Sequence, residues 1–86
     1  MKIKDGFLLR QVGGQCVVLP VGEELDMNMM ITLNETGAFL WEQLQKETDE
    51  AALVAALLGE YDVDAETARA SVRRFVEKID GHGFLA

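Results

Sequence analysis

The stretch Leu33-Asn34-Glu35-Thr36-Gly37-Ala38-Phe39-Leu40-Trp41-Glu42-Gln43-Leu44 predicts the helix around which the rest of the chain is organised. Asn34 is suited to the N-cap, because its side-chain oxygen can accept a hydrogen bond from a backbone N–H one turn into the helix. Glu35 then places a negative charge in the first turn, where the helix dipole favours it. We therefore expect a strand to end at about residue 33 and a helix to run from about Glu35 to Lys46.

One face of this predicted helix is apolar. The positions i, i+3, i+4 and i+7 are occupied by Gly37, Leu40, Trp41 and Leu44, and this spacing places them on a single face. Trp41 brings the largest apolar side chain available to a chain of this size. Gly37 would allow another backbone to approach closely. The pattern is typical of a core helix.

Upstream of this helix, residues 7–12 and 15–19 are apolar and extended in character. Gly13 and Gly14 join them, and a Gly-Gly pair between two strand-like runs favours a hairpin, since both glycines can take positive φ. Pro20 cannot donate to a sheet and marks the end of the second strand.

Residues 29–33 predict a short third strand. Alternation would put Met29, Ile31 and Leu33 on one face and Met30 and Thr32 on the other. The methionines would form an adaptable surface if this strand lies at a sheet edge, while ordinary core filling is the simpler interpretation for at least half of them.

Two more helices follow. Thr48 or Asp49 is expected to cap a helix that continues to about Glu60. Its expected buried stripe consists of Ala52, Leu53, Ala56 and Leu57.

Asp64 is expected to cap a third helix over residues 65–80, and Gly81 to end it. Its apolar face consists of Ala68, Val72, Phe75, Val76 and Ile79. We expect Phe84 and Leu85, in the tail beyond this helix, to fold back onto the core. Three antiparallel N-terminal strands followed by three helices indicate an α+β fold, and residues 1–86 are expected to form one domain.

The motif Leu-Asn-Glu-Thr-Gly-x-x-Leu-Trp-x-x-Leu that begins at Leu33 resembles the helix-opening signature of the PqqD-like family. The similarity extends to residues 48–53, residues 60–64 and the closing pattern Val-x-x-Phe-Val-x-x-Ile of residues 72–79. Members of this family are small winged helix-turn-helix domains that bind the leader segments of peptides destined for modification. The resemblance implies that fold and a non-catalytic, peptide-binding role.

The totals limit the alternatives. Fifteen acidic and eight basic residues give a net charge of −7, which argues against nonspecific binding of nucleic acid. A single cysteine, Cys16, excludes an internal disulfide. We find neither a signal-peptide pattern nor an apolar run of the roughly 20 residues that a membrane span needs. We expect a cytoplasmic protein that binds no membrane.

The sequence offers little support for catalysis. His82 is the only histidine, and nothing in the sequence brings it to Cys16. A nucleophile needs a base within hydrogen-bond reach. The chain lacks Cys-x-x-Cys, His-Glu-x-x-His and a phosphate-binding glycine loop. We expect neither enzymatic activity nor a cofactor or metal.

Four of the eight basic residues lie on the third predicted helix: Arg69, Arg73, Arg74 and Lys78. We rank peptide recognition first. Solvated charges that pair with acidic residues of the same helix, in a generic protein-interaction domain, rank second. DNA reading by the last helix of a winged helix ranks third, because the chain is acidic and the hairpin tip carries no Lys or Arg.

The resemblance also implies where a leader would lie, namely between the third strand and the third helix. Met29, Met30, Ile31 and Thr32 would supply the strand edge. Val72 and Val76 would supply an apolar floor, with Arg69 and Arg73 available for acidic leader side chains. The implied partners are a precursor peptide and a modifying enzyme, in this family often a radical SAM enzyme, and we expect a monomer or weak homodimer.

Overall fold

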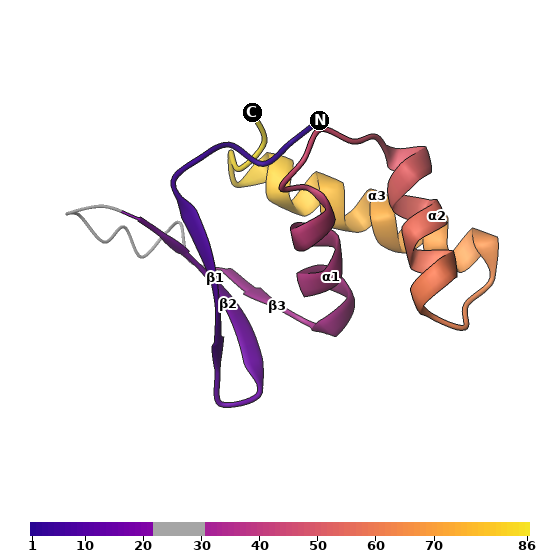
Figure 1. Cartoon of the computed structure of the whole chain (residues 1–86), viewed down its shortest axis with the longest axis horizontal. Coiled ribbons are helices and arrows are strands. Elements are labelled where there is room, and N and C mark those ends of the chain that lie inside the picture. Colours follow the sequence, from indigo (N-terminus) through magenta and orange to yellow (C-terminus); the bar gives the residue numbers. More distant parts are fainter. Residues whose placement is uncertain (22–30) are drawn as a thin grey trace.

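The computed structural model describes residues 1–21 and 31–86. Within these, the strands β1 (Phe7–Val12), β2 (Gln15–Pro20) and β3 (Ile31–Leu33) precede the helices α1 (Glu35–Gln43), α2 (Glu50–Glu60) and α3 (Ala65–Gly81). The strands gather on one side of the molecule and the helices on the other (Figure 1). The predicted α+β class is confirmed, and the arrangement is consistent with a winged helix.

The sheet is antiparallel in the order β1-β2-β3. Gly13 and Gly14, with φ of 57° and 85°, form the predicted turn between β1 and β2. Val18 of β2 lies opposite Leu9 of β1 on one side and Ile31 of β3 on the other. Among the described strands, β3 pairs only with β2, so its other side is an edge of this sheet.

All three helices begin at the predicted caps. Each capping side chain accepts a backbone hydrogen bond three residues further on: Asn34 from Gly37 at 2.7 Å, Asp49 from Ala52 at 2.8 Å and Asp64 from Thr67 at 2.7 Å. α1 ends at Gln43, three residues before the predicted Lys46.

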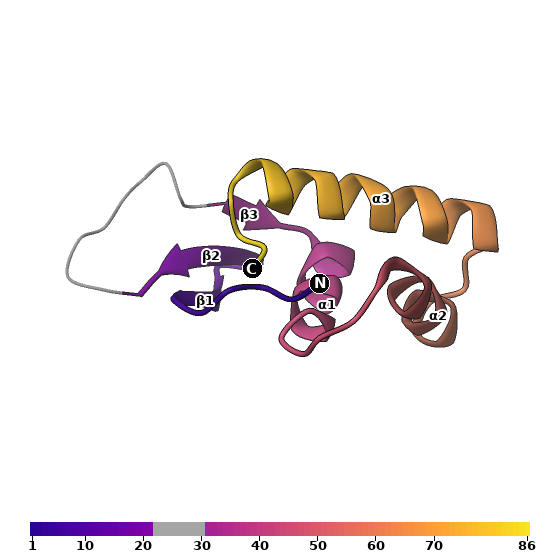
Figure 2. The same cartoon turned by 90° about the horizontal axis from the view of Figure 1, so that it is seen from above.

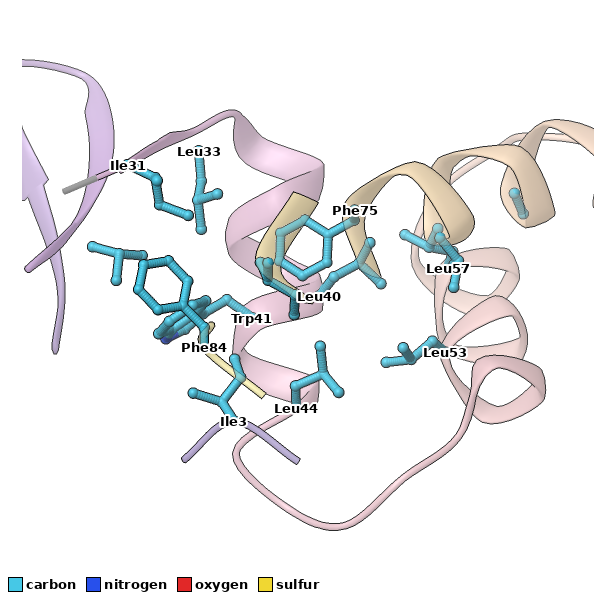
Figure 3. Close-up of a cluster of buried hydrophobic side chains, with 14 residues drawn as sticks. Ile3, Ile31, Leu33, Leu40, Trp41, Leu44, Leu53, Leu57, Phe75 and Phe84 are labelled. Carbon is cyan, nitrogen blue, oxygen red and sulfur yellow. The ribbon is translucent and has the colours of Figure 1, made fainter. Parts of the chain in front are cut away.

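The core lies where the helices meet the sheet (Figure 3). It contains the predicted Leu40 and Trp41 of α1 with its C-cap Leu44, Leu53 and Leu57 of α2, and Ala68, Val72, Phe75 and Ile79 of α3. Phe84 folds back from the tail and is fully buried, and Leu85 packs against the same cluster. The expected return of the tail is therefore confirmed.

Three details of the prediction were wrong. Ala52 is exposed, because α2 is an outer helix and only the Leu53 and Leu57 side of it reaches the core. Gly81 lies inside α3, and the chain turns at Gly83 instead, where φ is +78°. Gly37 does not allow another backbone to approach: the atoms nearest to it belong to the side chains of Asn34, Leu33 and Phe75.

The N-terminal residues pair with the C-terminal tail, a contact that the sequence did not predict. The Ile3 N–H donates to the carbonyl of Leu44 at 2.9 Å, and Ile3 forms an isolated β-bridge with Leu85. The Lys4 N–H donates to the carbonyl of Phe84 at 2.9 Å. The two termini consequently lie close together (Figure 1). Among the described residues, no helix has the length and apolar character needed to cross a membrane.

Candidate functional site

An open groove of about 410 Å³ lies between β3 with the start of α1 and the flank of α3. Figure 2 shows the C-terminal half of α3 running beside β3. Thr32, Leu33 and Leu40 line one side of the groove, and Ser71, Arg74, Phe75 and Lys78 of α3 line the other.

The α3 wall follows from helical periodicity. Its four residues are spaced i, i+3, i+4 and i+7, so they form one stripe along the helix. Phe75, 7% exposed, marks the boundary between this stripe and the core. Together with the buried Leu33 and Leu40 it makes the floor of the groove apolar.

Gly37 has no side chain to fill the end of the groove that is formed by the start of α1. A Cβ at this position would lie 3.4 Å from Cε1 of Phe75 and 3.1 Å from Oδ1 of Asn34. The second distance is tighter than most real contacts, and Asn34 Oδ1 is already held by its capping hydrogen bond. The glycine thus lets the Phe75 ring and the cap of α1 lie side by side at the groove.

The charge of the groove is opposite to that of the chain. Among the described residues that line it, Arg74 and Lys78 are the only charged ones, whereas the net charge of the protein is −7. Within residues 1–21 and 31–86 the one ion pair joins the N-terminal amine to Glu47. Both groove cations are therefore free of carboxylate partners in the described part of the chain.

The backbone of β3 also faces the groove. Nζ of Lys78 donates to the carbonyl oxygen of Thr32 at 3.2 Å, so this carbonyl points toward α3. The N–H and C=O of one residue in an antiparallel strand point to the same side. The backbone donor of Thr32 consequently faces the groove as well, so both groups lie on the side at which a strand could be added.

Of the four edge residues proposed from the sequence, Met29 and Met30 lie outside the described residues. Ile31 directs its side chain into the core and contributes backbone only. Thr32 is exposed and lines the groove, as the strand alternation predicted.

The helix residues proposed from the sequence lie elsewhere. Val72 is 1% exposed in the core and Val76 is half-buried against it, and neither lines the groove. With about 3.6 residues per turn, Arg69 and Arg73 lie on the opposite flank of the core face from the groove stripe. Arg69 contributes to the low pKa of Asp64, after the stronger effect of the hydrogen bond from the Thr67 N–H.

The flank that does line the groove carries Arg74 and Lys78. Both were recognised as basic residues in the sequence but not assigned to the site. Their spacing with Ser71 and Phe75 was the available signal, because a cationic stripe beside an aromatic residue is visible without a structure.

A second hollow of about 660 Å³ lies between the β1–β2 hairpin and the start of α1, and Cys16 and Glu35 are among the residues that line it. Cys16 is half-buried in β2, and the ring of His82 stacks on Phe84 with centroids 5.7 Å apart. The described residues include no group of three or more His, Cys, Asp and Glu placed to hold a metal ion. Cys16 and His82 therefore take part in packing, Cys16 within β2 and His82 against the ring of Phe84.

The sequence model of the family described as Coenzyme PQQ synthesis protein D (PqqD) matches residues 15–85. The chain belongs to the PqqD family. The match includes β2, β3 and all three helices, and therefore every residue named above as lining the groove.

Among solved structures, the chain resembles one titled "TbiB1 in Complex with the TbiA(beta) Leader Peptide", with a TM-score of 0.75 and 24% identity. The similarity covers 99% of this chain and 94% of that one, so the two share one fold over almost their whole length. No curated protein matches the chain.

Proposed function

We propose that this chain binds the leader segment of a ribosomally made precursor peptide in the β3–α3 groove and presents it to a modifying enzyme. The observation that carries the proposal concerns residues 1–21 and 31–86, within which β3 has an unpaired edge beside an apolar floor and two cations that form no ion pair. Membership of the PqqD family supports it, as does the shared fold with a protein whose structure contains a leader peptide.

An extended peptide binds such an edge through its backbone. The N–H and C=O of Thr32 pair with the peptide, and every second side chain of the peptide then faces the apolar floor. Phe75 and Leu40 select apolar side chains there, while Arg74 and Lys78 attract carboxylates.

The role proposed here is non-catalytic. Binding concentrates the precursor and orients it, and the chemistry takes place on a separate enzyme, which in this family is often a radical SAM enzyme. We further propose that residues 1–86 act as one cytoplasmic domain, as a monomer or weak homodimer. None of these steps requires a metal or cofactor on this chain.

The proposal is tested with peptides from short reading frames that neighbour the gene. Each synthetic peptide is titrated into the ¹⁵N-labelled chain, and the amide shifts are followed by NMR. We expect the largest shifts at Thr32, Leu33 and the 71–78 segment of α3. If the shifts are confined to the hairpin tip or α2 and the amides of β3 and α3 do not shift, the peptide binds elsewhere and the proposed groove is not the binding site.

A further inference from the structure

Among the residues that the structure describes, the side chain of Lys78 covers the unpaired edge of β3. The Lys78 ammonium occupies the Thr32 carbonyl at 3.2 Å, and both residues are otherwise exposed. An uncovered edge strand is a template for any extended chain, including a second copy of the same protein, and lysine is a residue that natural sheets use to protect such edges.

We propose that Lys78 is a removable cap on the β3 edge, and that its displacement makes the groove select peptides that carry a carboxylate beside Thr32. This inference rests on the proposed function, since it concerns how the same groove admits a leader. It assigns Lys78 a task distinct from that of Arg74, which lines the groove without contacting the edge carbonyl.

Competition follows from the geometry. A peptide strand that pairs with β3 must present its own N–H to the Thr32 carbonyl, at the position where the lysine donates. The displaced ammonium remains tethered to α3 and stays at the groove wall. A leader with a carboxylate at that point receives a charge-assisted hydrogen bond, whereas a neutral leader displaces the cap without this gain.

The neighbouring arginine strengthens the preference. Arg74 and Lys78 are four residues apart on α3, a spacing at which like charges repel. In the described part of the chain, no acidic residue lines the groove to offset them. A peptide carboxylate placed between the two cations relieves this repulsion, which a glutamine of the same shape does not.

The cap is separable from the fold. The packing of α3 on the rest of the molecule comes from the buried Val72, Phe75 and Ile79, while the lysine contributes its ammonium at the surface. Lys78→Met keeps most of the aliphatic stem and removes only the charge and the donor. Arg73→Met is the matched control, because it removes a cation from the exposed flank of the same helix.

The first experiment examines the free protein and needs no peptide. The ¹³C carbonyl chemical shift of Thr32 is measured in the wild type and in both variants. We expect Lys78→Met to shift this resonance and Arg73→Met to leave it unchanged. An unchanged resonance in Lys78→Met would show that the carbonyl is not capped and would overturn the proposal.

The second experiment uses an immobilised array of acetylated peptides of about ten residues that alternate Thr and Val, a length suited to an added strand. One series places a single Glu at each position in turn, and a matched series places Gln. We expect the wild type to favour Glu over Gln by about tenfold at one position. Lys78→Met should reduce this preference, leaving the part that Arg74 contributes, and should bind the Gln series more tightly than the wild type does.

The two experiments separate the possible failures. An equal preference for Glu in the wild type and in Lys78→Met would overturn the selectivity. If neither protein binds any peptide of the array and neighbouring precursor peptides also fail, the proposed function falls together with the selectivity. The carbonyl shift still decides on its own whether Lys78 caps the edge.

Discussion

The ring of Phe84 meets the indole of Trp41 edge to face, with ring centroids 5.6 Å apart and ring planes at 86°. Phe7 approaches both rings, at 4.6 Å from Phe84 and 6.4 Å from Trp41. These three aromatic residues come from β1, α1 and the C-terminal tail. The centre of the core thus joins segments that lie far apart in the sequence.

We expect Trp41→Ala to lower the free energy of unfolding by ~3–5 kcal/mol, because the side chain is 2% exposed and its removal leaves a cavity. This is a large share of the stability of a small domain. Urea unfolding followed by circular dichroism measures it. Trp41→Phe, which retains a ring against Phe84, should cost clearly less. If Trp41→Ala melts within a few degrees of the wild type, the assignment of Trp41 to the core is wrong.

The tail is expected to matter as much as the central helix. Phe84 is 0% exposed, so Phe84→Ala should also cost ~3–5 kcal/mol. His82→Ala is the matched control, because it removes an exposed ring that stacks on the same phenylalanine and should change stability by no more than ~0.5 kcal/mol. Equal losses in the two variants would contradict the burial of Phe84.

Local signals in the sequence predicted the helices well. Asn34, Asp49 and Asp64 are caps because a short acceptor side chain can reach an N–H three residues later, and this interaction needs no information from distant parts of the chain. The Gly13-Gly14 turn is equally local. The bridge between Ile3 and Leu85 was missed because a pairing of the two chain ends leaves no periodic pattern in either.

The candidate site was predicted only in part, for a related reason. Periodicity identified the core face of α3, but a core face has two flanks, and the sequence does not say which one lies next to β3. The choice of Arg69 and Arg73 selected the outer flank, whereas packing brings Arg74 and Lys78 to the strand. That choice depends on how the helix crosses the sheet, which is a tertiary property.

Asp64 should give the protein part of its sensitivity to acid. The hydrogen bond from the Thr67 N–H, followed by smaller effects that include Arg69, lowers the pKa of this carboxyl below its ordinary value of 3.8. A carboxyl with a depressed pKa in the folded state stabilises the fold above its unfolded-state pKa, and this contribution is lost as the pH falls through the folded-state value.

The melting temperature of the wild type should therefore fall more steeply below pH 3.8 than that of Asp64→Asn, which keeps a capping acceptor that does not ionise. Calorimetry between pH 2 and pH 7 measures the difference. Parallel curves for the two proteins over the acidic range would show that the Asp64 cap does not contribute to the pH dependence.

DNA binding is expected to be weak. The net charge of −7 repels phosphates, and the two cations of the groove lie beside β3 within a hollow rather than on a protruding face. Fluorescence anisotropy with a random duplex at low salt should give no affinity tighter than about micromolar. Tight binding with a steep dependence on salt would favour a DNA-reading winged helix over the proposed peptide carrier.

The two flanks of α3 offer a matched comparison of the two candidate sites. Arg74→Glu with Lys78→Glu reverses the groove charges, and Arg69→Glu with Arg73→Glu makes the same change of charge on the outer flank. All four side chains are exposed, so both double variants should fold. The groove variant should bind an acidic leader more weakly by ~1–3 kcal/mol, the scale of charge-assisted hydrogen bonds. The outer variant should change the affinity little, by the long-range charge effect alone.

Isothermal titration calorimetry with one peptide, at low and at physiological salt, compares the affinities of the two double variants. A larger loss in the outer variant would restore Arg69 and Arg73 as the peptide-binding arginines and would move the site away from β3.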